Sequence, residues 1–161
     1  MTILVSDANI FIDMEVADLI RPMFRLDDTF AIPDVLYKEE LQHHHPELPT
    51  LGLRIERLGG AGVAEVERLK LIYPGPSTND LFALALAKDR RWPLLSGDGH
   101  LRAVAKAEDV EIHGTIWLIE RMIVSGTLTP ARAHVSLELM RNGSRRLPWG
   151  EFEAMLARMG D

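Results

Sequence analysis

The sequence predicts an α/β protein in which helices cover both faces of a central, mostly parallel sheet, giving three α/β/α layers. Short runs of apolar and β-branched residues alternate along the chain with longer segments of helical spacing. Glycine, proline and other turn formers lie between these segments. Strands separated by helices usually pair in parallel, and the connecting helices then cover both faces of the sheet. The length of 161 residues suits one domain with one core.

The first strand is expected at residues 2–6, a short apolar run that contains Ile and Val. Asn9 is a suitable N-cap for the helix that follows, in which Ile10, Met14 and other apolar residues recur. Pro22 is expected to end or bend this helix, because proline cannot donate a backbone hydrogen bond.

Residues 30–33 form the second expected strand, and Asp34 is a candidate cap for a helix that runs toward Gln42. Pro46 and Pro49 close that helix off. The next segment, residues 51–58, is compatible with either a helix or a strand.

Two helices are expected in the middle of the chain, at residues 64–72 and 81–90. The breaker at residues 73–76 separates them. Ser77 and Asp80 have the spacing of a capping box at the start of the second helix.

The second half of the chain continues the alternation of strand and helix. Strands are expected at residues 93–96 and 110–113, with a helix at 100–107 between them and another at 114–123 after them. The tail holds a helix that starts near residues 127–130 and ends at Met140, a polar loop at 141–146 and a last helix at 151–159.

Composition limits the classes of function. The formal net charge of −6 has the wrong sign for a passive nucleic-acid binder, but a nuclease could offset it locally with divalent cations. The absence of cysteine excludes disulfides and thiolate chemistry. The first residues show no secretory leader, and the apolar runs are too short to span a bilayer. A cytoplasmic protein without membrane contact is therefore expected.

Three aspartates occupy positions typical of active sites in α/β proteins. Asp7 and Asp98 follow predicted strands, and sites in parallel sheets lie beyond the carboxyl ends of the strands. Asp80 opens the helix that leads into the strand before Asp98. Glu39 and Glu40 lie within a predicted helix, so only one of them is expected to face a site shared with the aspartates.

Each acid also has a purely structural interpretation. Asp80 is suited to capping its helix, Asp98 between two glycines is a turn former, and Glu40 alone would be a solvated helix residue. Asp7 is the hardest to explain this way, because an acid directly after a buried strand needs a partner or a metal ion. Taken together, the four acids favour a metal site over coincidence.

Four segments of the chain resemble the PIN domain, a nuclease fold found in many toxin components of toxin–antitoxin systems. The segments are residues 3–13, 32–41, 79–85 and 94–102. The resemblance covers roughly residues 1–118. It implies a PIN-like domain at residues 1–125, followed at 126–161 by a helical C-terminal extension that packs on the domain or contacts a partner.

The resemblance assigns catalytic roles to Asp7, Glu40, Asp80 and Asp98, and among these it implies that Asp7, Asp80 and Asp98 bind Mg²⁺ or Mn²⁺. Hard cations of this kind prefer carboxylate and water oxygens. One further set of residues is expected to support the metal ligands: Asn9, Ser96 and Asp13. The usual fourth motif of the family has two adjacent acids, whereas this chain has only Asp98 between glycines, which predicts weaker binding of a second metal.

The resemblance also implies the function: a divalent-metal-dependent endoribonuclease, the toxin of a toxin–antitoxin pair, with an RNA substrate, a cognate antitoxin and a homodimer. Arg102 and Lys106, one turn apart on the helix after Asp98, are the best-placed candidate RNA contacts. Two other basic pairs are candidate phosphate contacts, at residues 90–91 and 145–146. The alternatives are a non-catalytic PIN-like module that binds RNA or a partner and, below it, a haloacid-dehalogenase-type phosphatase.

Overall fold

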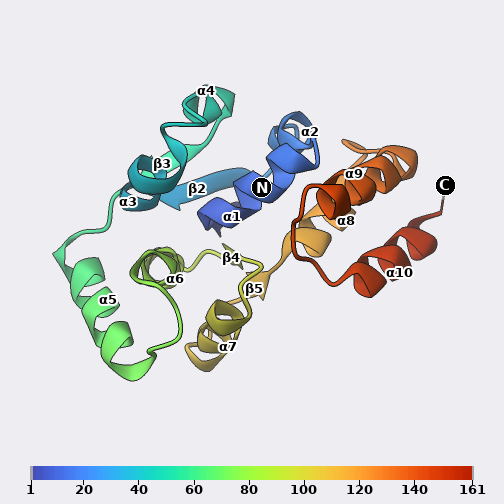
Figure 1. Ribbon diagram of the computed structural model, residues 1–161. Helices are drawn as coiled ribbons and strands as arrows, with labels where there is room; N and C mark the ends of the chain where they lie inside the picture. The colour runs from blue at the N-terminus through green and yellow to red at the C-terminus, as the bar shows by residue number, and fades with distance from the viewer. Residues whose placement is uncertain (1, 161) are drawn as a thin grey trace.

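The computed structural model describes residues 2–160, and its centre is a five-stranded parallel sheet (Figure 1). The strands are β1 (Ile3–Ser6), β2 (Thr29–Pro33), β3 (Arg54–Glu56), β4 (Leu94–Leu95) and β5 (Ile112–His113). Their order across the sheet is β3-β2-β1-β4-β5, and every neighbouring pair is parallel. The α/β class is confirmed, and the sheet, predicted as mostly parallel, is entirely so.

The register of the strands brings their carboxyl ends to one edge of the sheet. Ser6 of β1 pairs with Leu95 of β4, and Leu95 pairs in turn with His113 of β5. The segments that follow these three strands therefore start side by side, at the edge where parallel sheets place their functional sites.

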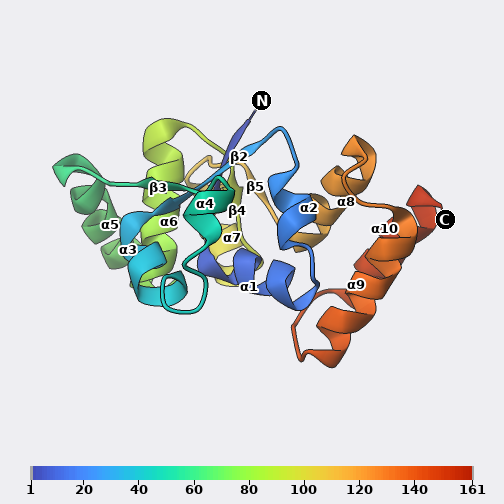
Figure 2. The same cartoon turned by 90° about the horizontal axis from the view of Figure 1, so that it is seen from above.

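Helices cover both faces, which confirms the three-layer arrangement (Figures 1 and 2). One face carries α5 (Gly60–Ile72), α6 (Thr78–Arg90) and α7 (Gly99–Ala107); the other carries α1 (Ala8–Val16) and α2 (Ile20–Phe24). Beside α1 lie α8 (Thr115–Ser125), α9 (Pro130–Asn142) and α10 (Trp149–Met159). Three short helical segments connect β2 to β3: α3 (Asp34–Leu36), the π-helix η1 (Tyr37–Leu41) and α4 (Leu48–Leu51).

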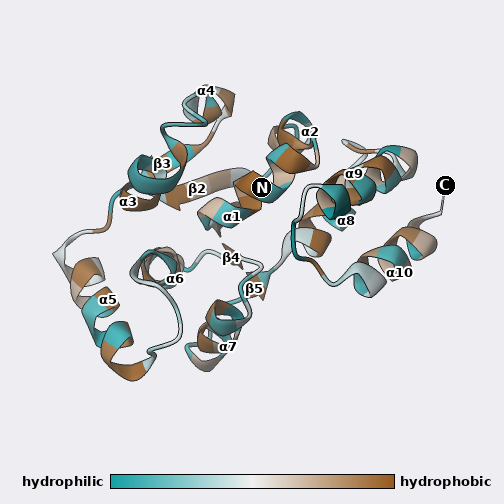
Figure 3. Cartoon of the chain, viewed as in Figure 1, coloured by the Kyte–Doolittle hydropathy of each residue, from teal (hydrophilic) through white to brown (hydrophobic). Residues whose placement is uncertain are grey.

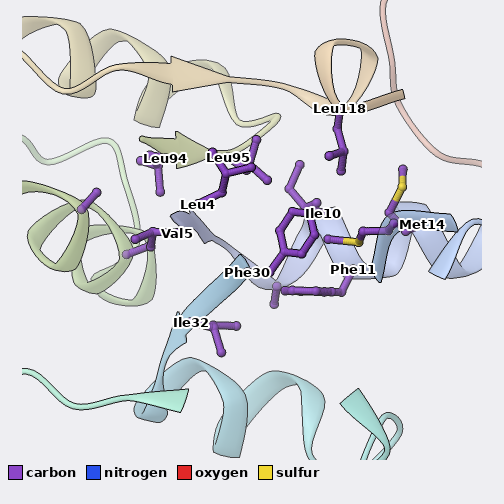
Figure 4. Close-up of a cluster of buried hydrophobic side chains, with 14 of the residues drawn as sticks. Leu4, Val5, Ile10, Phe11, Met14, Phe30, Ile32, Leu94, Leu95 and Leu118 are labelled. Atoms are coloured by element: carbon purple, nitrogen blue, oxygen red, sulfur yellow. The ribbon is translucent and has the colours of Figure 1, made fainter. Parts of the chain in front are cut away.

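The core forms on both sides of the sheet because successive strand residues point to opposite faces. Val5 points toward α6, whereas Phe30 points toward α1 and packs among Ile10 and Phe11 (Figure 4). The β2 ribbon is largely hydrophobic along its length (Figure 3). A strand covered on both faces is expected to have this continuous apolar composition.

The first two predicted helices differ from the prediction. The first helix ends at Val16, because Asp18 adopts a left-handed conformation with φ 58°. Pro22 therefore does not end that helix but lies in the first turn of α2, where the missing N–H removes no hydrogen bond. The predicted helix from residue 35 to 42 is also not a regular α-helix, since residues 37–41 form a π-helix.

The last two helices are packed on the rest of the molecule. α9 contacts α1 and α8, and α10 contacts α8 and α9. Phe152 of α10 is completely buried. None of the helices in residues 2–160 has the length and apolar character needed to cross a membrane.

Replacing Phe152 with Ala is expected to lower the free energy of unfolding by about 3–5 kcal/mol, because a large apolar side chain is removed from a filled core. Urea denaturation followed by circular dichroism measures the change. Arg158→Ala on the same helix is the control and should change stability by less than about 1 kcal/mol, because its ion pair with Glu120 is exposed. Equal effects of the two substitutions would contradict the packing of α10.

Candidate functional site

Asp7 is the buried centre of the site. It follows β1 directly, and only 2% of the residue is exposed. Its backbone is extended, and its Oδ1 accepts a hydrogen bond of 3.1 Å from the amide of Ile10, so that Asp7 itself caps α1. The predicted N-cap, Asn9, is therefore wrong: it lies exposed in the first turn of the helix. The carboxylate accepts the backbone hydrogen bond because it comes first after the strand.

Ser96 connects Asp7 to Asp98. Its buried hydroxyl donates to Asp7 Oδ2 at 2.6 Å and accepts from the backbone amide of Asp98 at 3.1 Å. Asp98 in turn caps α7, with Oδ1 accepting from the amides of His100 and Leu101 at 2.8 and 3.1 Å. The turn after β4 thus fixes one oxygen of Asp98 and leaves Oδ2 outside the cap.

The electrostatic environment of Asp7 disfavours its charged form. Burial raises the pKa of Asp7 from 3.8 to about 7, and the negative charges of Asp80 and Asp13 add to this rise. The hydrogen bonds from Ser96 and Ile10 lower the pKa but offset only part of the effect. A nearby cation would stabilise the charged form of this carboxyl group.

Asp80 lies at the start of α6 in the predicted capping box. The amide of Asp80 donates to the hydroxyl of Ser77 at 3.1 Å, and the amide of Ser77 donates to Asp80 Oδ2 at 3.0 Å. The capping box predicted from the sequence is confirmed. Asp80 also raises the pKa values of Asp7 and Glu40, so its charge acts on both of them as well.

Glu40 is on the exposed side of the π-helix η1. Partial desolvation of its carboxyl group and then the charge of Asp80 raise its pKa. Only one of Glu39 and Glu40 was expected to face the site, but Glu39 also accepts a hydrogen bond of 2.9 Å from the Asn79 side-chain amide. Both glutamates therefore lie near the start of α6. The π-helix explains the difference, since its wider turn changes the direction of each side chain, and such turns are frequent at functional sites.

Asp13 is held by two groups from distant parts of the chain. Its Oδ1 accepts from Arg145 Nε at 2.6 Å, and its Oδ2 accepts from the Thr115 hydroxyl at 2.8 Å. The residue is 6% exposed. The link from α1 to Arg145, in the segment after α9, was not predicted. A separation of 132 residues gives no periodic signal that could have revealed it.

Two cavities adjoin this group of side chains. One, of about 390 Å³, is lined by Asn9, Asp13, Asp98, Arg145 and other residues. The second, of about 260 Å³, shares Asp13, Gly97 and Arg146 with the first and is also lined by Arg102. Lys106, the other predicted RNA contact, is exposed one turn further along α7 and lines neither cavity.

The oxygen donors of the site have the chemistry that Mg²⁺ and Mn²⁺ prefer. The charge of Asp80 acts on Asp7 and Glu40, and the Ser96 hydroxyl joins Asp7 to the turn of Asp98. Within residues 2–160, however, no group of three or more His, Asp or Glu side chains is arranged closely enough to hold a metal ion. The donor types fit a divalent cation, although the side chains do not form a closed set of ligands.

Comparison with known proteins identifies the family of the chain. The model of a protein family described as a PIN domain matches residues 3–161. The match extends through α9 and α10, so it is longer than the resemblance recognised from the four motifs. No curated protein matches the chain.

Proposed function

Because this chain belongs to the PIN-domain family, whose fold is that of nucleases, we propose that it is a divalent-metal-dependent endoribonuclease that hydrolyses RNA phosphodiester bonds. The observation that carries the proposal is the buried Asp7, whose pKa is raised to about 7. A neutral residue at this buried position would make the fold more stable, because burial of a charged carboxylate costs free energy. A carboxylate kept among other acids is accounted for by a cation that offsets their charge.

We assign the cation to Asp7, Asp80 and Asp98, with Asn9, Ser96 and Asp13 supporting them. When bound, Mg²⁺ or Mn²⁺ would supply activation of a water molecule and stabilisation of the leaving oxygen. The Ser96 hydroxyl holds Asp7 Oδ2 in place, and Asp98 Oδ2 remains outside its helix cap. The raised pKa of Glu40 suits its carboxylate to accept the proton released by the attacking water.

The proposal extends to the biological setting. We assign the enzyme to the cytoplasm as the toxin of a toxin–antitoxin pair, with a cognate antitoxin and a homodimeric state, as the resemblance implies. We also propose that residues 1–125 form the nuclease domain and that residues 126–161 are an extension, which packs on this domain through α9 and α10.

A second candidate is a non-catalytic PIN-like module that binds RNA or a protein partner. Asp98 is the single acid of its turn, and one of its oxygens is used to cap α7. Asp13 is already neutralised by Arg145. Both features favour weaker metal binding than a full set of free acids would give. The haloacid-dehalogenase-type phosphatase is set aside, because the chain belongs to another family.

Cleavage of an end-labelled RNA pool tests the proposal. The purified protein is expected to cut RNA in Mg²⁺ or Mn²⁺ and to stop when EDTA is added, because the cation completes the site. Gel electrophoresis of the products measures the rate. RNA that is retained but uncut in saturating Mn²⁺ would favour the binding module, and cleavage that persists in EDTA would contradict metal dependence.

A further inference from the structure

The second cavity, between α7, α8 and the segment that joins α9 to α10, is a separate feature from the acidic group. In Figure 1 the orange-red segment joining α9 to α10 runs beside α8. Arg102 of α7 and Arg146 of this segment both line the cavity. Two elements that are far apart in sequence thus bring guanidinium groups to one opening.

The two arginines are free for a ligand. The side chains of Arg102 and Arg146 form no hydrogen bond or ion pair with any residue between 2 and 160, and both residues are exposed. The Arg102 guanidinium lies against the start of α8, since a Cβ built on Gly114 would be 3.2 Å from Arg102 Nη1. Arg145 differs, because its Nε is engaged with Asp13 at 2.6 Å.

The balance of charge in the cavity favours an anion. Three carboxylates also line it, those of Asp13, Glu120 and Glu151. Asp13 is paired with Arg145, and Glu120 is paired with Arg158 at 3.0 Å. Only Glu151 lacks an ion pair within the described residues, so two uncompensated positive charges face one uncompensated negative charge.

We propose that Arg102 and Arg146 form a subsite for one backbone phosphate of the RNA, next to the position that is cleaved. The inference rests on the proposed function and adds a substrate-binding role for the C-terminal extension. The cavity shares Asp13, Gly97 and Arg146 with the cavity that Asp98 lines, so an RNA strand held here would lie next to the acids. Guanidinium groups bind phosphate oxygens through paired hydrogen bonds, which fix the register of the strand.

Base stacking on Trp117 is not part of the subsite. Its ring stacks on His113 with centroids 4.0 Å apart, and the guanidinium of Arg121 lies 5.2 Å from it. The aromatic faces are therefore in use within the protein. Recognition at this position depends on the phosphate, and we expect it to be insensitive to base identity.

The test is binding of a 5′-fluorescein-labelled, single-stranded 12-nucleotide RNA, measured by fluorescence anisotropy. Asp80→Asn serves as the background, so that the probe is not cut. Arg146→Met is expected to raise Kd about tenfold and to lower the slope of log K against log[salt] by about 0.7, the value for one phosphate of a single strand. The double variant with Arg102→Met should lose no more slope than this, because both arginines hold the same phosphate.

Two further variants test the charge balance of the cavity and provide a control. Glu151→Gln should tighten binding about twofold, because it removes the uncompensated carboxylate. Arg25→Met is the matched control: Arg25 is exposed and precedes β2, at the opposite edge of the sheet from the site, and its loss should leave Kd unchanged. Melting temperatures of all variants verify that they are folded.

The outcomes separate the subsite from the proposed function. RNA binding that is equal in Arg146→Met, in the double variant with Arg102→Met and in Arg25→Met would overturn the subsite, while metal-dependent cleavage by the parent would still support the nuclease. No binding of RNA by the Asp80→Asn background or the parent would overturn both. A double variant that loses twice the slope would overturn the single-phosphate arrangement.

Discussion

Asp7→Asn is expected to stabilise the metal-free protein while it abolishes RNA cleavage. A rise in the pKa of Asp7 from 3.8 to about 7 destabilises the folded state by about 4 kcal/mol at a pH where Asp7 is charged in both the folded and the unfolded protein. Asparagine removes this penalty. Its carbonyl oxygen can still accept from the Ile10 amide, and its NH2 group can donate to the Ser96 hydroxyl, where Asp7 Oδ2 was the acceptor. A gain in stability together with a loss of activity is the signature of an acid kept for function.

The sign of this effect depends on pH. Well below pH 3.8, Asp7 is neutral in both the folded and the unfolded state, so the variant has no advantage. Between pH 4 and about 7 the unfolded state releases the proton first, so the parent loses stability relative to the variant. Above pH 7 the difference is constant and largest.

Urea denaturation in EDTA at pH 4, 6 and 8 measures the stability difference, and the cleavage assay measures activity. Mn²⁺ should raise the melting temperature of the parent but not of Asp7→Asn, because only the folded parent binds it. Asp27→Asn, an exposed residue before β2, is the control and should change neither stability nor cleavage. A variant that is less stable than the parent at pH 8, with cleavage intact, would refute a functional role for Asp7.

Asp80→Asn and Ser77→Ala are expected to separate the capping of α6 from the role of Asp80 in RNA cleavage. Ser77→Ala removes the hydroxyl that caps α6 and should cost about 1 kcal/mol, but it leaves the Asp80 carboxylate in place, so cleavage continues. Asp80→Asn should cost less than about 1 kcal/mol, the typical effect of one charge at a helix start. Its cleavage rate should nevertheless fall by a factor on the order of 10²–10³, as for loss of other preorganised catalytic groups.

Single-turnover cleavage in Mg²⁺ and thermal unfolding of the same preparations provide both measurements. The comparison is controlled internally, since the two residues share one pair of reciprocal hydrogen bonds. If the two variants lose activity in proportion to stability, Asp80 acts only as a helix cap. Loss of activity in Asp80→Asn alone supports its place in the metal site.

The alternation of strands and helices could be predicted because each element has a local signal. The apolar run of β1 and the capping box of Ser77 and Asp80 arise from contacts within a few residues. The positions of Asp7 and Asp98 followed from these signals, since acids after parallel strands gather at one edge of the sheet. The roles of these acids in a metal site remain predictions.

Predictions of local structure were wrong where two local preferences compete. Asn9 and Asp7 are both good caps, and the position of Asp7 at the end of β1 decided which one accepts from Ile10. Residues 37–41 have the composition of an ordinary helix, and only the surrounding structure makes this segment a π-helix. Helical spacing alone therefore could not show that Glu39 and Glu40 both lie near α6.

The sequence by itself determined the fold class, the strand–helix order and the family, because these depend on short-range periodicity and on motifs whose spacing is fixed. Tertiary structure alone decided the pKa of Asp7, which depends on burial and on the charges of Asp80 and Asp13. It also decided that Arg145 binds Asp13 while the adjacent Arg146 stays unpaired beside Arg102. These residues lie far apart in the sequence. They come together because α9 packs on α1 and α8, and α10 packs on α8 and α9.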